Sequence, residues 1–330
     1  MIIVTGAAGY VGSHLIYELQ KKNKVLGVDN FFNSSVQVIK SIKKYDLKDN
    51  FRFMKVDCTK YKDLEKIFKI KNIETVIHCA ALKNVNESIK NKKSYKFNNE
   101  ISTKNILKLV TKYRSKYFIH CSTAALYDSN NTMPLLEDSN FKITSPYALT
   151  KLNSEKYIIN SFKKNNHSLY FIIRFFNPLG ANKKLTQHND LNKNDLITNI
   201  KKTILQNKEL KIYGNTWPTK DGTPVRDFFS ILDLVDAIKI LIVKLKTKKI
   251  KKSLIFNLGS GRGYTILDTI KLFERVTKKK IKYRFIKRLN HEVYKSIASI
   301  KFAKKVLKWK PKRSLKSALK SSWDYSNSKY

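Results

Sequence analysis

Short apolar runs alternate with amphipathic stretches through the first half of the chain. Six apolar runs predict strands, at residues 2–6, 24–29, 51–57, 75–81, 117–122 and 169–176. The stretches between them repeat apolar residues at helical spacing and predict helices, for example at residues 11–21, 62–68 and 95–113, with another after Tyr147. Strands and helices in strict alternation indicate repeated βαβ units, so the predicted fold is α/β with a doubly wound parallel Rossmann sheet.

This rhythm ends after residue 176 with the polar segment "KKLTQHNDLNKND", and most of the remaining glycines and prolines follow it. The change predicts a domain boundary, with a Rossmann domain at 1–176 and a second, smaller α/β lobe at 177–330. We expect part of the second lobe to pack back on the first. The last segment, from about residue 312, keeps apolar spacing and predicts a final helix with a loose tail.

The glycine-rich segment "VTGAAGYVGSH" follows the first predicted strand and opens the first predicted helix. Gly6, Gly9 and Gly12 permit a tight turn and close approach of the backbone to a pyrophosphate at the helix N-terminus. Asp29 ends the second strand, where a carboxylate accepts hydrogen bonds from ribose hydroxyls and repels a 2′-phosphate, which favours NAD over NADP. Asp57 ends the third strand and either approaches the adenine or caps the next helix.

The segment "TSPYALTKLNSEKYI" places Tyr147 and Lys151 four residues apart. Thr144 or Ser145 can cap a helix whose first residue is Pro146. One helical turn separates the pair, so the phenol and the ammonium group are predicted to share one face. An ammonium group favours the phenolate and lets a tyrosine act as a base near neutral pH.

The composition narrows the class of protein. The formal net charge is +42, from 67 Lys and Arg against 25 Asp and Glu. Lysines are spread along the chain and outnumber arginines, whereas base and phosphate recognition favours arginine, so no specific nucleic-acid partner is expected. No apolar run is long enough to span a membrane, and three scattered cysteines suit reduced thiols, so we expect a cytoplasmic protein. The histidine spacing predicts no metal site.

Taken together, these segments resemble the extended short-chain dehydrogenase/reductase family and, within it, the UDP-glucose 4-epimerases. The resemblance runs from residue 2 to about residue 310. It rests on the Tyr147–Lys151 pair and on five further segments: "HCSTAALY", "AALKNVNES", "FNNE", "RFFNPLGAN" and "IYGNTWPTKDGTPVRDF". The last two are the most specific, because unrelated dinucleotide enzymes lack them.

The resemblance implies a role for each matching residue. It assigns catalysis to Tyr147, Lys151 and Thr123, with Tyr147 and Thr123 also contacting the sugar. It assigns NAD binding to Tyr147 and Lys151 together with Gly6, Gly9, Tyr10, Val11, Gly12, Asp29, Asn30, Asn33, Asp57, Cys58, Ala80, Lys83, Asn99, Ser122 and Phe176. For Phe176 a core position is the alternative. It assigns binding of the UDP-sugar to Thr123 and Tyr147 and, in the second lobe, to Asn177, Asp195, Leu196, Tyr213, Arg226, Arg288 and His291.

The implied activity is interconversion of UDP-galactose and UDP-glucose by transient hydride transfer to tightly bound NAD, in a homodimer. Ala124 and Ala125 stand where related dehydratases carry an acid pair, which favours epimerisation over elimination of water. Asp195 and His291 depart from the family pattern. The alternatives are a 4-epimerase of N-acetylated or uronic UDP-sugars and, from another class, a polyanion-binding protein on a vestigial Rossmann scaffold.

Overall fold

The computed structural model describes residues 1–70, 72–163, 167–185, 195–289 and 292–327. The chain divides into two compact units, each built from several segments. Unit 1 comprises residues 1–126, 145–174 and 238–256, and unit 2 comprises residues 127–144, 175–237 and 257–330.

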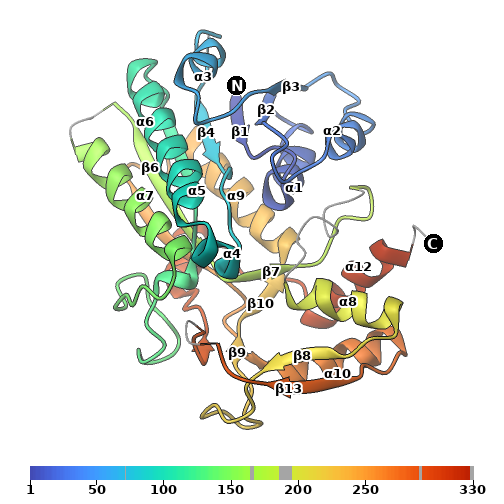
Figure 1. Cartoon of the computed structure of the whole chain (residues 1–330). Coiled ribbons are helices and arrows are strands. Elements are labelled where there is room, and N and C mark those ends of the chain that lie inside the picture. The colour runs from blue at the N-terminus through green and yellow to red at the C-terminus, as the bar shows by residue number, and fades with distance from the viewer. Residues whose placement is uncertain (71, 164–166, 186–194, 290–291, 328–330) are drawn as a thin grey trace. The chain divides into compact units, whose positions relative to one another are not determined.

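A seven-stranded sheet forms the centre of unit 1 (Figure 1). Its strands are β1 (Ile2–Thr5), β2 (Val25–Asp29), β3 (Phe51–Lys55), β4 (Thr75–His78), β5 (Tyr117–Thr123), β6 (Leu169–Phe175) and β11 (Leu254–Leu258). Their spatial order is β11-β6-β5-β4-β1-β2-β3. The order reverses direction at β1, where β1 pairs in parallel with both β2 and β4. Such a switch point leaves a crevice at the carboxyl ends of the strands, where doubly wound folds bind their ligands.

Helices cover both faces of this sheet. Those of unit 1 are α1 (Tyr10–Leu19), α2 (Val36–Lys43), α3 (Tyr61–Phe68), α4 (Val85–Lys90), α5 (Lys92–Lys96), α6 (Ser102–Lys112), α7 (Pro146–Lys163) and most of α9 (Ile231–Lys246). Apolar side chains of α3, α6 and α7 share one buried core with β1, β2, β4, β5 and β6. On the other face, α1 packs against α2, and an ion pair between Glu18 and Lys239 joins α1 to α9.

Unit 2 contains short strands and several helices. Its strands are β7 (Asn177–Leu179), β8 (Leu210–Tyr213), β9 (Val225–Arg226), β10 (Phe228–Ser230), β12 (Tyr264–Thr265), β13 (Tyr283–Ile286) and β14 (Lys295–Ser296). Its helices include α8 (Leu196–Gln206), α10 (Ile266–Thr277), α11 (Lys301–Leu307) and α12 (Leu315–Asn327). The helices α8, α10 and α12 enclose a core with Phe228, Phe273 and Trp323.

The predicted doubly wound sheet is confirmed, and each of the six predicted strands is present. The seventh strand, β11, was not predicted, because it lies in the half of the chain where the βαβ rhythm has ended. The predicted helix at 95–113 is divided between α5, a π-helical turn at Phe97–Ile101 and α6. Within the described residues, no helix is both long and apolar enough to cross a membrane.

Candidate active site

The glycine-rich turn leaves no room for side chains at two of its three glycines. Gly6 has φ +68°, and a Cβ there would lie 2.8 Å from the backbone nitrogen of Ala80. A Cβ at Gly12 would lie 2.1 Å from the carbonyl oxygen of Gly6, where the first turn of α1 crosses the loop. The bare backbone therefore stays accessible at the N-terminus of α1, which is the arrangement that binds a pyrophosphate.

Asp29 ties this turn to the end of β2. Its Oδ2 accepts a hydrogen bond from the backbone of Ala8 at 3.0 Å, and its Oδ1 accepts bonds from the backbone of Phe31 and the hydroxyl of Ser34, both at 2.8 Å. The carboxylate is buried, and Oδ2, which among the described residues accepts only the bond from Ala8, retains acceptor capacity for a ribose hydroxyl. The fit to a dinucleotide thus rests on both the glycine turn and the acid at the next strand end.

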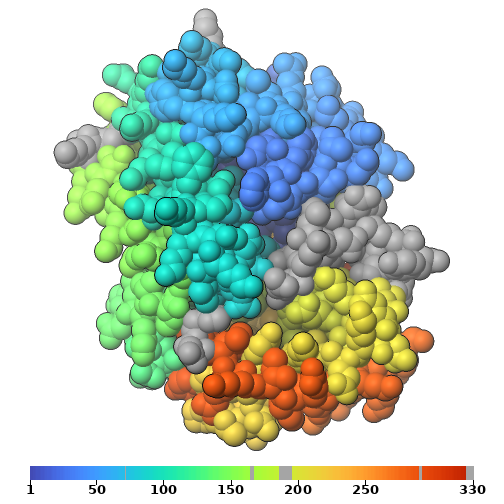
Figure 2. Space-filling view, in the orientation of Figure 1, coloured from blue at the N-terminus to red at the C-terminus, as the bar shows by residue number. Residues whose placement is uncertain are grey.

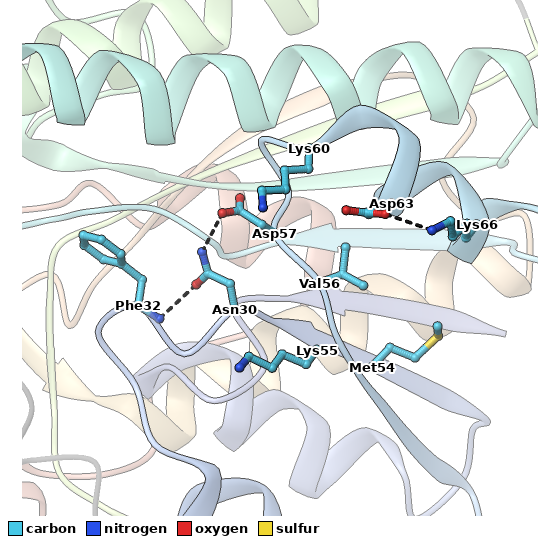
Figure 3. Close-up of a pocket in the computed structure, with 9 residues that line it drawn as sticks. All are labelled: Asn30, Phe32, Met54, Lys55, Val56, Asp57, Lys60, Asp63 and Lys66. Atoms are coloured by element: carbon cyan, nitrogen blue, oxygen red, sulfur yellow. Dashed lines mark hydrogen bonds and ion pairs between the residues drawn. The ribbon is translucent and has the colours of Figure 1, made fainter.

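A pocket of about 510 Å³ opens beside Asp29, at the ends of β2 and β3 (Figure 3). Asn30 is one of the residues that line it, and its side-chain amide donates to Asp57 at 3.1 Å and accepts from the backbone of Phe32 at 3.0 Å. Burial would raise the pKa of Asp57, but hydrogen bonds from Thr59 and Asn30 lower it below the ordinary value. The capping alternative for Asp57 is wrong, because Lys60 is the residue that precedes the first turn of α3. The Asp57 side chain instead accepts a bond from the backbone of Thr59 at 2.8 Å.

The predicted catalytic residues meet in unit 1, at the carboxyl end of β5. Tyr147 lies in the first turn of α7, whose N-terminus is capped by Ser145 through a bond from the backbone of Ala148 at 3.2 Å. The side chain of Thr123, the last residue of β5, is hydrogen-bonded to Tyr147. The Lys151 ammonium donates to the carbonyl oxygen of Cys121 at 2.7 Å. All three predicted catalytic side chains are therefore buried and close to one strand end.

Burial dominates the proton affinities of this group. It raises the pKa of Tyr147 to about 12, although the bond from Thr123 acts in the opposite direction. It lowers the pKa of Lys151 to about 8, against the raising effect of Glu155 and two thiols. In the protein alone, the phenol is therefore neutral at pH 7, and the expected lowering of the Tyr147 pKa requires positive charge beyond that of Lys151.

The side chains of two predicted cofactor residues form hydrogen bonds with other residues of the protein. Asn99 lies in the π-helical turn, accepts from the backbone of Leu82 at 2.8 Å and donates to Thr150 at 2.9 Å. Ser122 donates to the buried carboxylate of Glu155 at 2.5 Å. Both side chains thus hold the backbone around the site, and their predicted contacts with the cofactor remain predictions.

The other predicted cofactor residues of unit 1 surround the same strand ends. The ammonium group of Lys83 lies 5.7 Å from the centre of the Tyr10 ring, at the start of α1. Val11 and Ala80 are half-buried, Asn33 is exposed, and Cys58 is a buried free thiol. Because β1 to β5 are parallel, these segments converge on one edge of the sheet.

Apart from Thr123 and Tyr147, the predicted UDP-sugar residues that the structure describes belong to unit 2. Arg226 on β9 forms an ion pair with Glu292 at 2.8 Å. The guanidinium of Arg288 lies over the ring of Trp217, 4.3 Å from its centre. Tyr213 ends β8 and is exposed, and its carbonyl oxygen accepts a bond from the Trp217 indole at 3.3 Å. The structure therefore brings Arg288, Tyr213 and Trp217 together.

Four further predicted residues have structural contacts in unit 2. Asp195 caps α8 through a bond from the backbone of Thr198 at 2.9 Å, and Leu196 packs against the core of the unit. Asn177 begins β7, and the ring of Phe176 is buried and stacks on Tyr127 with the centres 6.4 Å apart. The stacking agrees with the core alternative for Phe176. His291 lies outside the described residues.

Sequence reasoning missed Glu155 and Arg174. Glu155 lies one turn beyond Lys151 on α7 and pairs with Arg174 of β6, with Nη2 to Oε2 at 2.7 Å and both side chains buried. The helical spacing of Tyr147, Lys151 and Glu155 could have identified the acid, because positions i, i+4 and i+8 share a face. The pairing with Arg174 has no comparable local pattern.

Comparison with known proteins agrees with this geometry. The profile of the NAD dependent epimerase/dehydratase family matches residues 2–259. The chain belongs to this family. It is 33% identical to UDP-glucose 4-epimerase of Bacillus subtilis, over 99% of this chain and 97% of that protein. It is 34% identical to UDP-glucose 4-epimerase of Dictyostelium discoideum, over 98% and 95%.

Solved structures have the same fold. The UDP-glucose 4-epimerase from Stenotrophomonas maltophila, with bound NAD and formylated UDP-arabinopyranose, aligns with a TM-score of 0.92 at 26% identity, over 99% of this chain and 98% of that one. The Bifidobacterium longum enzyme with NAD+ and UDP gives 0.90 at 29%, over 99% and 98%. A UDP-glucuronic acid 4-epimerase from Bacillus cereus gives 0.87 at 30%, over 100% and 99%.

Proposed function

We propose that this chain is a UDP-glucose 4-epimerase that interconverts UDP-galactose and UDP-glucose with NAD. The observation that carries the proposal is the cluster of Tyr147, Thr123 and Lys151 at the end of β5. It lies in the same unit as a glycine turn and an acid suited to a dinucleotide. Full-length similarity to UDP-glucose 4-epimerases supports the same reading.

The chemistry follows from the positions of the Tyr147 and Thr123 side chains. Tyr147 accepts the proton of the sugar 4-hydroxyl, and Thr123 steadies that oxygen by a hydrogen bond. NAD, when bound, supplies a hydride acceptor for the same carbon and a positive charge that favours the phenolate of Tyr147. Return of hydride to the opposite face of the 4-keto sugar inverts the carbon, and Tyr147 gives the proton back.

Inversion requires that the keto sugar turn over without leaving the protein. Attachment through the diphosphate allows this, because it holds the nucleotide while the sugar rotates. Arg226 and Arg288 of unit 2 are the proposed diphosphate residues, and guanidinium groups suit bidentate phosphate contacts. We assign UDP-sugar binding to the second lobe, residues 177–330, and NAD binding to residues 1–176.

Two features favour this reaction over its relatives. Ala124 and Ala125 provide no acid for elimination of water from the keto sugar. Similarity to UDP-glucose 4-epimerases favours neutral sugars, whereas the 30% identity to a UDP-glucuronic acid 4-epimerase keeps uronic UDP-sugars as the second candidate.

We further propose a cytoplasmic homodimer that serves galactose metabolism. Three apolar side chains of unit 1, Ile89, Phe97 and Leu149, are exposed on α4, the π-helical turn and α7. Packing of α4, α5 and the π-helical turn against α7 places these residues on neighbouring elements. The surface formed by residues 85–101 is coloured cyan in Figure 2. Exposed apolar groups on adjoining helices favour association with a second copy.

The proposal is tested by adding UDP-galactose to the purified protein without any added cofactor and following the anomeric proton by NMR. Formation of UDP-glucose supports both the activity and a retained NAD. If the reaction fails even with added NAD, the same assay with UDP-glucuronic acid and UDP-N-acetylglucosamine tests the second candidate. Failure with every sugar contradicts the proposal and favours a binding protein.

A further inference from the structure

Glu292 contacts Arg226 of β9, one of the two arginines to which the proposed function assigns diphosphate binding. Its Oε1 lies 2.8 Å from Nη2 of Arg226, while Nη1 of the same guanidinium donates to the carbonyl oxygen of Val225 at 3.0 Å. The two side chains are only 14% and 24% exposed. Contacts with the described residues therefore engage two of the five N–H groups of Arg226, and among these residues the other three remain for another anion.

The backbone around this pair is held in place. Strand β14 pairs in parallel with β9, so Ser296 lies opposite Arg226, and the backbone of Asp227 donates to Ser296 at 3.0 Å. The Asp227 side chain is fully buried and accepts a bond from the backbone of Ala298 at 3.0 Å. The backbone N–H of Glu292, shortly before β14, donates to the carbonyl oxygen of Leu289 at 3.1 Å. The Arg226–Glu292 contact therefore joins two anchored segments.

Glu292 offsets the effect of burial on the Arg226 guanidinium. Burial lowers the pKa of the Arg226 guanidinium, and both the charge and the hydrogen bond of Glu292 raise it. A buried guanidinium without a partner is costly, so the carboxylate compensates the charge of Arg226 and holds its side chain in place in the unliganded protein. The same negative charge opposes the approach of a diphosphate.

We propose that Glu292 occupies Arg226 as an internal substitute for the substrate diphosphate, and that its charge limits the affinity of the site for anionic nucleotides. This inference rests on the proposed function, because it takes Arg226 as a diphosphate-binding residue. A diphosphate displaces the carboxylate or shares the guanidinium with it. In either case, removing the carboxylate charge strengthens nucleotide binding.

Isothermal titration of the full chain with UDP and with uridine tests this role. We expect Glu292→Gln to bind UDP about fivefold more tightly than the wild type, because one negative charge beside a partly solvated site is removed. Uridine affinity should not change, since uridine lacks the diphosphate. Glu209→Gln is the matched control: Glu209 is an exposed acid of the same unit, 3.6 Å from Arg284, and its loss should leave UDP affinity within about twofold.

Glu292→Asp keeps the charge and guards against a variant that does not fold. We expect its UDP affinity to stay near that of the wild type, and an increase equal to that of Glu292→Gln would overturn the role of the charge. Unchanged or weaker UDP binding by Glu292→Gln would overturn the inference while leaving the proposed function intact. Absence of UDP binding by the wild type and all variants would contradict both.

Discussion

The Lys151 ammonium donates a hydrogen bond to the carbonyl oxygen of Cys121 at 2.7 Å, which fixes α7 against the end of β5. Contacts with the same strand end occur one turn earlier, between Tyr147 and Thr123, and one turn later, where Ser122 donates to Glu155. One face of α7 thus holds three successive residues of β5. This arrangement orients the phenol before any substrate binds, which is the geometric condition for proton transfer.

Replacement of Tyr147 by Phe should reduce turnover of UDP-galactose by roughly 10²- to 10⁴-fold, the usual contribution of a positioned base. Bound NAD should remain, because the ring and α7 are retained. Turnover is measured by NMR and NAD by release from the denatured protein. The matched control is Tyr157→Phe. It removes another phenol of α7, one that is hydrogen-bonded to Glu100, and it should keep wild-type turnover. Near-normal turnover in Tyr147→Phe would exclude this residue as the base.

The depressed pKa of Lys151 predicts how stability depends on pH. The ordinary pKa of a lysine side chain is 10.5, and burial lowers that of Lys151 to about 8 in the folded protein. Between these values the unfolded chain binds more protons, so this residue makes unfolding less favourable as the pH rises. The free energy of unfolding of the wild type, relative to Lys151→Met, should therefore increase by on the order of 2 kcal/mol from pH 7 to pH 10.

Urea unfolding of both proteins at pH 7 and at pH 10 measures this difference. Subtracting the variant removes the titration of the other lysines, which the two proteins share. A difference that stays constant with pH, or that falls, would show that the Lys151 pKa is not depressed in the folded state.

Asp29→Ala should lower the preference for NAD over NADP by about tenfold or more, because it removes the charge that repels a 2′-phosphate. It should also destabilise the protein by about 1–3 kcal/mol, since the backbone N–H of Ala8 loses its buried acceptor. Affinities for the two cofactors are compared by titrating cofactor-stripped protein. Asp63→Asn, at a residue that lines the pocket beside Asp29 at the ends of β2 and β3, is the control and should change neither quantity appreciably. An unchanged preference in Asp29→Ala would remove Asp29 as the selecting residue.

Sequence patterns predicted those features of the fold and site that depend on residues close together in the chain. The shared face of Tyr147 and Lys151 follows from helical periodicity, and the glycine turn before α1 follows from its spacing. By contrast, Lys151 binds a main-chain carbonyl, and any residue at position 121 supplies one. Strand β11 joins the sheet beside β6, more than seventy residues earlier in the chain, so its place depends on tertiary pairing.

The same distinction explains the ionic contacts. Arg226 and Glu292 are 66 residues apart, and Glu155 and Arg174 are 19 apart on different elements. Among 67 basic residues, sequence alone offers no means to choose which of them finds an acid. Asp57 shows the converse limit: its position before a helix suggested a cap, yet the helix begins three residues later than a capping role requires.

The buried pair of Glu155 and Arg174 predicts a difference between single and double variants. Glu155→Met leaves the Arg174 guanidinium buried without its carboxylate and should destabilise the protein by about 3–5 kcal/mol. Replacing both residues by Met removes both charges and keeps similar volume, so the double variant should regain most of that loss. Urea unfolding of the wild type, the two single variants and the double variant gives the coupling energy. A double variant as unstable as Glu155→Met would mean that the bond from Ser122 to Glu155, not the ion pair, carries the stabilisation.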